Sequence, residues 1–254
     1  MADVDEEAPG ANSVLGKARL ILEAFQLDDD SLTLTEITRR TGISKPSVYR
    51  LNQELLDWGM LERSGLEYRL GMRAFELGSR VPRFRVLRDA VRPYMESLHY
   101  RTRETVHLAV LDGLEVLYLE KVAGGPRAAR PSRIAGRLPL HSTATGKVLL
   151  AFGSPSLLQD LLARGPLQRV TPMTITQPGA LSGQLQRARQ AGYATEREET
   201  TAGYCSVAVP IFGSSGLLLA AVSLTTAAAG SSPTQHAELL KSLSRKVSAS
   251  GAVN

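Results

Sequence analysis

The segment that decides the fold is residues 32–70, with the sequence LTLTEITRRTGISKPSVYRLNQELLDWGMLERSGLEYRL. Thr33 stands three residues before Glu36, which is the spacing of a capping box, so we expect a helix to begin there. Gly42 suits the left-handed conformation in which many helices end. Ser44 can then act as the N-cap of a second helix. The segment therefore predicts two short helices joined by a tight turn.

The second of these helices has an apolar side and a polar side. Its apolar positions recur at helical spacing and comprise Val48, Leu51, Leu55 and Leu56. Two helices joined by a short glycine-containing turn, with hydrogen-bond donors on the outer side of the second, form the helix-turn-helix arrangement. In that arrangement the second helix enters the major groove of DNA, where its side chains reach base edges and phosphates.

A small hairpin should follow the helix pair. Residues 60–63 and 66–70 flank the dipeptide Ser64-Gly65, which predicts two strands and a tight turn, the wing of a winged helix. The side chains expected to contact DNA are polar or basic and lie outward on the helices and the hairpin. They are Arg39, Arg40, Ser44, Lys45, Ser47, Tyr49, Arg50, Gln53, Arg63 and Arg69. The acidic run at 28–30 is expected to be a solvated loop away from the phosphates.

Length and composition narrow the class of protein. A chain of 254 residues, 43% hydrophobic and 22% charged, is typical of a soluble globular protein with one large or two ordinary domains. The net charge of +5 favours anionic partners. The acidic start MADVDEEAPG and the absence of a long apolar run predict a cytoplasmic protein without a membrane span or secretory signal. The single cysteine, Cys205, excludes an intrachain disulfide and a cysteine-based zinc site.

The second half of the chain mixes strand and helix patterns. The β-rich runs predict strands at 105–111, 116–122, 207–211 and 217–225. Helical spacing predicts helices at 86–103, 142–152, 156–163, 181–191 and 234–248. This mixture is typical of an α+β domain with one antiparallel sheet flanked by helices.

Several sequence blocks resemble one known family. TGISKPSVYRL, LLDWGMLER and YRLGMRAFELG resemble the DNA-binding domain of IclR-type transcriptional regulators. GRLPLHSTATGKVLLA and GYATEREETTAGYCSVAVPIF resemble the two signature blocks of that family's effector domain. The resemblance extends from about residue 13 to residue 246, and the blocks keep one order. It implies a disordered tail (1–12), a winged helix-turn-helix domain (13–71), a linker helix (72–85) and a GAF-like effector-binding domain (86–248).

The block around residue 143 is a candidate ligand site. Ser142 or Thr143 can cap the helix that follows, and a helix start offers unpaired backbone amides to an anion. By the family resemblance, this helix start forms one wall of an effector pocket and polar positions elsewhere form the other. The implied effector-binding residues are Thr143, Ala144, Thr145, Gly146, Glu196, Tyr204, Ser206, Ser223 and Thr225.

Two residues depart from the family pattern. Tyr204 stands where an aliphatic residue is usual, which would shrink or flatten the pocket. Asn52 stands where a leucine is usual, which would either alter the packing under the recognition helix or add a contact to DNA.

Motifs for catalysis, metals and cofactors are missing from the sequence. The four histidines have no metal-ligand spacing, and no GxSxG, P-loop or GxGxxG motif occurs. Cys205 is interpreted as a small buried cysteine. The acidic residues at 196, 198 and 199 are interpreted as a loop entering a strand rather than as the paired carboxylates of a hydrolase. We therefore predict no catalytic residues, no metal and no cofactor.

These observations favour a regulator that represses a catabolic operon. It would bind palindromic double-stranded operator DNA as a homodimer or homotetramer and respond to a small organic acid or aromatic acyl compound. Two alternatives stay open: an enzyme-like second domain acting on a small acid, and a DNA-bound architectural dimer without an effector. Turnover of candidate metabolites separates the enzyme from the sensor, and ligand-dependent operator affinity separates the sensor from the architectural protein.

Overall fold

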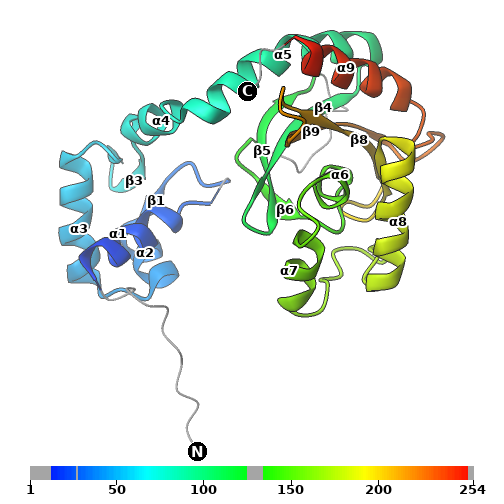
Figure 1. The fold of residues 1–254 in the computed structure, drawn as a ribbon. Helices are drawn as coiled ribbons and strands as arrows, with labels where there is room; N and C mark the ends of the chain where they lie inside the picture. Colours follow the sequence, from blue (N-terminus) through cyan, green and yellow to red (C-terminus); the bar gives the residue numbers. More distant parts are fainter. Residues whose placement is uncertain (1–12, 27, 125–133, 251–254) are drawn as a thin grey trace, which may run out of the picture. The chain divides into compact units, whose positions relative to one another are not determined.

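The chain folds into two compact units that divide after Pro82 (Figure 1). The computed structural model describes residues 13–26, 28–124 and 134–250. The predicted tail at residues 1–12 lies outside the described residues. No helix within the described ranges combines the length and apolar character needed to cross a membrane.

The first unit contains short helices and a small antiparallel sheet in the order β1-β3-β2. Its elements are α1 (Val14–Glu23), β1 (Leu32–Thr33), α2 (Leu34–Thr41), α3 (Lys45–Asp57), β2 (Leu61–Ser64), β3 (Glu67–Leu70) and α4 (Met72–Ser79). The predicted helix pair and hairpin are both confirmed. Strand β1 was not predicted; it pairs with β3 through Leu32 opposite Tyr68, and both side chains are buried.

Local capping signals define the helix pair as expected, with one exception. The Thr33 hydroxyl accepts a hydrogen bond from the Glu36 amide at 3.2 Å, and the Glu36 carboxylate accepts one from the Thr33 amide at 2.8 Å. Gly42 ends α2 with a φ of 68°, the left-handed conformation that glycine adopts without strain. Ser44 occupies the N-cap position of α3, but its side chain makes no capping hydrogen bond. Its hydroxyl donates instead to the Ser47 hydroxyl at 3.0 Å.

Asn52 lies inside the core of the first unit. Val48, Leu51 and Leu55 of α3 are buried in this core together with Ile37 of α2, as their spacing predicts. Asn52 is fully buried on the same helix, and neither atom of its amide group has a hydrogen-bond partner among the described residues. The burial of Asn52 favours the first of its two predicted consequences, altered packing under the recognition helix, over a contact with DNA.

The second unit is built on a six-stranded antiparallel sheet in the order β6-β5-β4-β9-β8-β7. Its strands are β4 (Thr105–Asp112), β5 (Glu115–Val122), β6 (Arg137–Pro139), β7 (Ala194–Arg197), β8 (Tyr204–Phe212) and β9 (Leu218–Ala227). Its helices are α5 (Pro82–Thr102), α6 (Ala144–Phe152), α7 (Leu157–Ala163), α8 (Pro178–Ala191) and α9 (Ala237–Ala249). The α+β class and the single antiparallel sheet are confirmed.

Apolar side chains on each face of this sheet build a separate core. Leu87 and Val91 of α5 pack with Leu240 of α9 against one face. Helices α6 and α8 cover the opposite face, where Val148 and Leu185 are buried (Figure 1). Two layers of helices therefore enclose the sheet.

The sequence patterns misplaced several boundaries. Residues 194–197 form strand β7, whereas a loop was expected at 196–199, and β6 was not predicted. Helix α8 begins at Pro178 rather than at 181, because proline suits the first turn of a helix. Helix α9 begins at Ala237 rather than at 234. Helix α5 begins at Pro82, so the stretch at 72–85 contains all of α4 and the first residues of α5.

Asn52→Leu should stabilise the first unit. A buried amide group without hydrogen bonds costs about 1–3 kcal/mol, and leucine removes that cost at similar volume. We expect the free energy of unfolding of this unit, measured by urea denaturation, to rise by about that amount. Asn52→Asp should destabilise the unit, because it places a carboxylate in the same site. Equal stability of all three proteins would mean that solvent reaches residue 52.

Candidate nucleic-acid interface and ligand pocket

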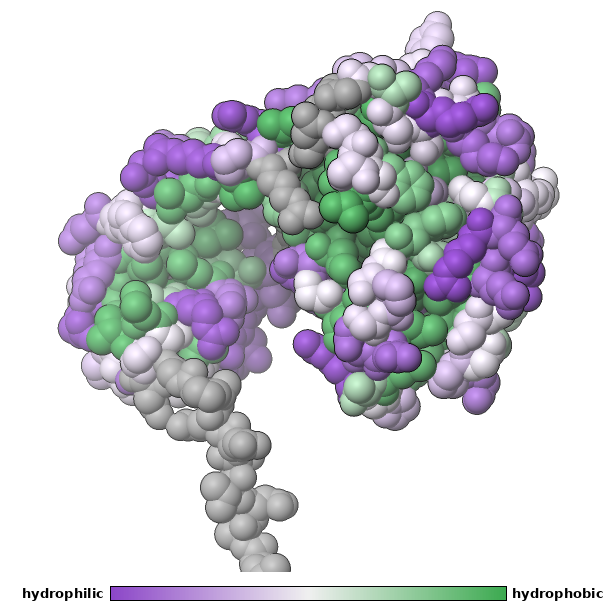
Figure 2. Space-filling model, viewed as in Figure 1, coloured by the Kyte–Doolittle hydropathy of each residue, from purple (hydrophilic) through white to green (hydrophobic). Residues whose placement is uncertain are grey.

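Helix α3 presents a polar, exposed side to solvent. Lys45, Tyr49 and Arg50 are exposed, and Figure 2 shows hydrophilic residues along the outer edge of this helix. Arg50 forms an ion pair with Glu54 one turn later, at 2.6 Å between Nη1 and Oε1. Because both side chains are more than half exposed, this pair is weak and leaves the guanidinium available to an external anion. Ser47 and Gln53 are only partly exposed.

Arg40 has an internal partner that the sequence did not suggest. Its guanidinium forms an ion pair with Asp29 and donates a hydrogen bond to the Ala24 carbonyl at 2.8 Å. The Asp29 carboxylate also accepts a hydrogen bond from the Gln26 amide at 2.7 Å. The Arg40 hydrogen bond holds the pKa of Asp29 below its usual value. The expectation of a freely solvated acidic loop is therefore wrong for Asp29, and Arg40 holds the segment after α1 against α2.

The hairpin arginines also have neighbours within the first unit. Arg63 lies over the ring of Tyr68, with its guanidinium carbon 4.3 Å from the ring centroid. Arg69 pairs with Glu62 across the hairpin, at 2.8 Å between Nη2 and Oε2. Glu62 accepts a second hydrogen bond from the Met72 amide at the start of α4, and this bond and the Arg69 contact lower its pKa. Arg63 and Arg69 remain exposed, as does Arg39 on α2.

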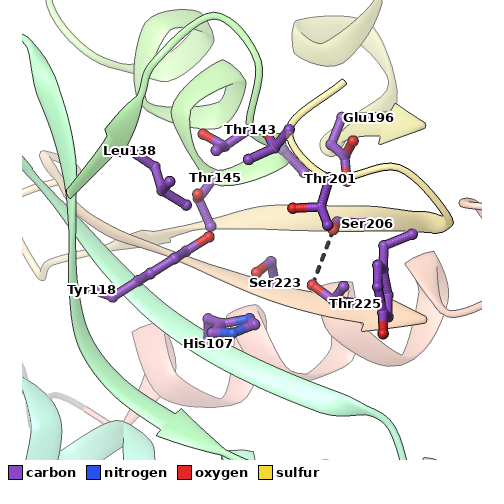
Figure 3. A pocket seen from close by; sticks show the side chains of 13 residues that line it. His107, Tyr118, Leu138, Thr143, Thr145, Glu196, Thr201, Ser206, Ser223 and Thr225 are labelled. Carbon is purple, nitrogen blue, oxygen red and sulfur yellow. Dashed lines mark hydrogen bonds between the residues drawn. The ribbon is translucent and has the colours of Figure 1, made fainter. Parts of the chain in front are cut away.

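A pocket opens in the second unit on the side of the sheet covered by α6 (Figure 3). The empty space between its walls measures about 550 Å³, including the part open to solvent. Of the effector-binding residues implied by the resemblance, those that line it are Thr143, Ala144, Thr145, Glu196, Tyr204, Ser206, Ser223 and Thr225. Residues that the sequence analysis missed also line it, namely His107, Tyr118, Leu138, Thr200 and Thr201.

Gly146 is the exception and does not line the pocket. A Cβ atom at this position would lie 2.2 Å from the Leu140 carbonyl oxygen, so the glycine allows α6 to pack against the preceding chain. Its amide donates a hydrogen bond to the Thr143 hydroxyl at 3.0 Å, which makes Thr143 the N-cap. The first amides of a helix have no intrahelical acceptor. Ala144 and Thr145, which line the pocket, therefore offer amide donors at the positive end of the helix dipole.

Hydroxyl groups and one carboxyl group form the wall opposite α6. Ser206 of β8 and Thr225 of β9 lie opposite each other in register, and their hydroxyls are 3.0 Å apart (Figure 3). Ser223 is 1% exposed, and its hydroxyl has no hydrogen-bond partner within the described part of the chain. Glu196 of β7 is buried and accepts a hydrogen bond from the Glu199 amide at 3.0 Å. Burial raises the pKa of Glu196 to about 7.

Two stacked rings line the pocket from the central strands. His107 of β4 and Tyr118 of β5 have ring centroids 4.7 Å apart and an interplanar angle of 24°. Burial lowers the pKa of His107 to about 3 and raises that of Tyr118 to about 12, so both rings are uncharged at neutral pH. The Tyr118 and Thr145 hydroxyls point toward each other (Figure 3). His107 is a polar residue at an alternating position of an apolar strand, a signal that becomes informative only once the pairing of β4 is known.

Other candidate chemistry finds no support in the described residues. Cys205 is buried, and burial raises the pKa of its thiol, which disfavours the thiolate that a nucleophile requires. No cluster of histidine, cysteine or carboxylate side chains suitable for a metal ion occurs within residues 13–26, 28–124 and 134–250.

Comparisons with known proteins match both units. A family model described as "Bacterial transcriptional regulator IclR C-terminal" matches residues 83–249, and one described as "IclR helix-turn-helix domain" matches residues 14–65. The transcriptional regulator XynR of Escherichia coli K12 is 36% identical over 212 residues, which cover 83% of this chain and 84% of XynR. The regulator KdgR of Dickeya chrysanthemi is 34% identical over 227 residues, which cover 89% of this chain and 74% of KdgR.

One solved structure in particular resembles the whole chain. The crystal structure of an IclR homolog from Microbacterium hydrocarbonoxydans, complexed with 4-hydroxybenzoate, has a TM-score of 0.88 and 33% sequence identity. The match covers 95% of this chain and 100% of that one.

Proposed function

The chain belongs to the IclR family and is a ligand-responsive, DNA-binding transcriptional regulator; on this premise we propose that it represses a catabolic operon and releases it on binding a small aromatic acid. The observation that carries the proposal is the pocket, which is lined by the first residues of α6 and by the hydroxyl-bearing residues Ser206, Ser223 and Thr225. Its relatives are transcriptional regulators rather than enzymes, which leaves the enzyme alternative without support.

The proposed effector has an acid group at one end and a hydroxyl or amide at the other. Its carboxylate binds the start of α6, where amide donors and the helix dipole favour negative charge. Its far end meets Ser206, Thr225 and Ser223, whose buried hydroxyl has no hydrogen-bond partner among the described residues. A planar ring fits between these ends, because the stacked His107 and Tyr118 rings offer an uncharged aromatic surface. The 4-hydroxybenzoate bound by the Microbacterium relative has this chemistry.

The proposed DNA contacts combine base and phosphate recognition. Lys45, Tyr49 and Arg50 on α3 reach base edges in the major groove, with Ser44, Ser47 and Gln53 beside them. Arg39 of α2 and Arg63 and Arg69 of the hairpin contact phosphates, which position the protein without reading sequence. Arg40 contributes mainly by holding the loop after α1, because its guanidinium is already engaged by Asp29.

A dimer on a palindromic operator is part of the proposal. One winged helix contacts a short half-site, so useful specificity requires at least two. Helix α4 has no buried residue, and its side chains Met72 and Phe75 are 63% and 72% exposed. We assign this apolar surface to the dimer contact. Two such dimers can then associate into a tetramer through their effector domains. We place this regulator in the cytoplasm. The dimer has a state that binds the operator tightly and one that binds it weakly, and the effector must bind these two states unequally to change operator affinity.

Arg50→Ala should weaken operator binding. Loss of one base contact costs about 1–3 kcal/mol and relaxes specificity at one base pair, which competition binding with mutated operators measures. Arg19→Ala is the matched control, because Arg19 forms an equally exposed ion pair with Glu23 one turn along α1. Equal affinities of the two variants would overturn the assignment of α3 as recognition helix.

Ser223→Ala should weaken effector binding. Calorimetry with 4-hydroxybenzoate should show a loss of about 0.5–1.5 kcal/mol, the net value of one hydrogen bond. Ser248 on α9 also has a buried hydroxyl without a partner among the described residues, but it does not line the pocket. Ser248→Ala is therefore the control and should bind as the unaltered protein does. Undiminished binding by Ser223→Ala would place the ligand elsewhere.

Phe75→Glu should disrupt the dimer. A carboxylate on the apolar side of α4 opposes burial of that surface, so the sedimentation coefficient at micromolar concentration should fall toward that of a monomer. Leu217→Glu, at an equally exposed leucine in the turn between β8 and β9, should leave the sedimentation coefficient unchanged. An unaltered protein that sediments as a monomer would rule out the dimer.

A further inference from the structure

Three ionisable side chains are buried together beside the pocket. Lys147 of α6 and Glu199 form an ion pair in which the two side chains are 1% and 5% exposed. The backbone amide of Glu199 donates the hydrogen bond to Glu196, whose carboxyl group lines the pocket. The cluster therefore runs from the helix that provides one pocket wall to the strand that provides the other.

The charges in this cluster do not balance when all three groups are ionised. Lys147 supplies one positive charge, whereas Glu196 and Glu199 supply two negative charges. A buried charge without a partner is strongly disfavoured, so one carboxyl group should hold a proton. Glu199 contacts the cation directly and also lies near the Ile175 amide, which leaves Glu196 as the group that takes the proton.

The titration of Glu196 reflects these neighbours. Burial is the main cause that raises its pKa to about 7, and the negative charge of Glu199 acts in the same direction. The hydrogen bonds from Ser206 and from the Glu199 amide, and the positive charge of Lys147, act in the opposite direction. Glu196 therefore changes charge near neutral pH.

Other titratable side chains on β4, β5 and β8 line the pocket or lie near Glu196. His107, Tyr118 and Tyr204 line the pocket, and the charge of Glu196 acts on Cys205. Burial keeps the His107 ring neutral and raises the pKa values of Tyr118 and Cys205. Strand β9 contributes only the hydroxyls of Ser223 and Thr225 to the pocket.

We infer that Lys147 and Glu199 are positioning residues that control the charge on Glu196, so that an anionic effector enters the pocket together with one proton. The inference rests on the proposed binding of an aromatic acid. A carboxylate bound at the start of α6 adds a negative charge opposite Glu196 and so favours its protonated form. The protonated carboxyl group is also a hydrogen-bond donor, which an ionised one is not. The pocket consequently accepts a monoanion with a proton, or a neutral amide without one, and disfavours a dianion.

The first test uses the ligand-free protein. Glu196 has a folded pKa above its ordinary value of 4.5, so the folded state binds more protons between pH 4.5 and about 7. Its contribution to stability is present below this range, falls as pH rises through it, and is constant above it. Tm of Glu196→Gln minus Tm of the unaltered protein should therefore increase up to pH 7 and then level off.

Variants of the ion pair test whether Lys147 and Glu199 control the titration of Glu196 or only stabilise the fold. The Tm of each variant is compared with the Tm of the same variant that also carries Glu196→Gln, and the pH at which this difference levels off is recorded. With Glu199→Gln, Lys147 is left with Glu196 as its only carboxylate, so the levelling-off should move to lower pH. With Lys147→Met, the two carboxyl groups lose their cation and it should move to higher pH. Both single variants should have a lower Tm than the unaltered protein. The inference would be overturned if the Tm differences do not depend on pH, or if the levelling-off moves in the same direction in both variants.

The second test measures proton uptake on binding. Calorimetry of 4-hydroxybenzoate at pH 8 in phosphate and in Tris, which differ in ionisation enthalpy, should show uptake of about one proton per ligand, falling toward zero at pH 6. The neutral 4-hydroxybenzamide should bind without uptake, and Glu196→Gln should bind the acid without uptake at either pH. No uptake by the unaltered protein at pH 8, or equal uptake by Glu196→Gln, would overturn the inference. If neither compound binds at any pH, the proposed effector class is wrong. The Tm measurements on the ligand-free protein then decide by themselves whether Lys147 and Glu199 control the charge on Glu196.

Discussion

The second unit depends on the burial of α6, a helix enclosed along nearly its whole length. Enclosure requires a glycine at position 146, because any side chain there would collide with the Leu140 carbonyl. It also places the ammonium group of Lys147 in the interior, which demands a buried carboxylate and fixes Glu199 beside it. The segment after β7 is tied to this position by further bonds, in which Thr174 donates to the Glu199 carbonyl and Thr200 donates to the Ser142 carbonyl. The packing of one helix thus positions the pocket wall at its own start and the segment that follows β7.

In the first unit, internal ion pairs compete with contacts to DNA. Arg40 and Arg69 each neutralise a carboxylate of the same unit, so its basic surface carries fewer free cations than the sequence suggests. Glu62 accepts hydrogen bonds from both the hairpin and the first residue of α4. At Gly71 a Cβ atom would lie 2.1 Å from the Gly59 carbonyl, so the chain between hairpin and helix passes in close contact with the end of α3. The start of α4 is consequently tied to the hairpin of the first unit.

Local sequence signals predicted local structure well. The capping pair Thr33 and Glu36 and the C-terminal Gly42 act within a few residues, and the structure has all three in the expected roles. Strand β7 was missed because its polar residues show no apolar alternation, although Glu196 is buried by the surrounding fold. His107 and Tyr118 meet through the pairing of β4 with β5, which contains a bulge after Leu108 that a single sequence does not reveal. The Arg40–Asp29 pair likewise depends on how α1 packs against α2. Gly146 was assigned to the pocket because it lies in a sequence block that resembles the family, and that block does not show that the glycine packs against Leu140 instead.

The buried amide of Asn52 has a consequence for how long the protein persists in a cell. An unsatisfied polar group in a small core increases the fraction of molecules in which that core is transiently open. Proteases cleave such open forms, and cleavage follows their population when opening is fast. Operator DNA binds only the closed form and therefore lowers that population. Molecules bound to operator DNA would then be degraded more slowly than molecules in free solution. The number of target sites would therefore help to set the abundance of the protein.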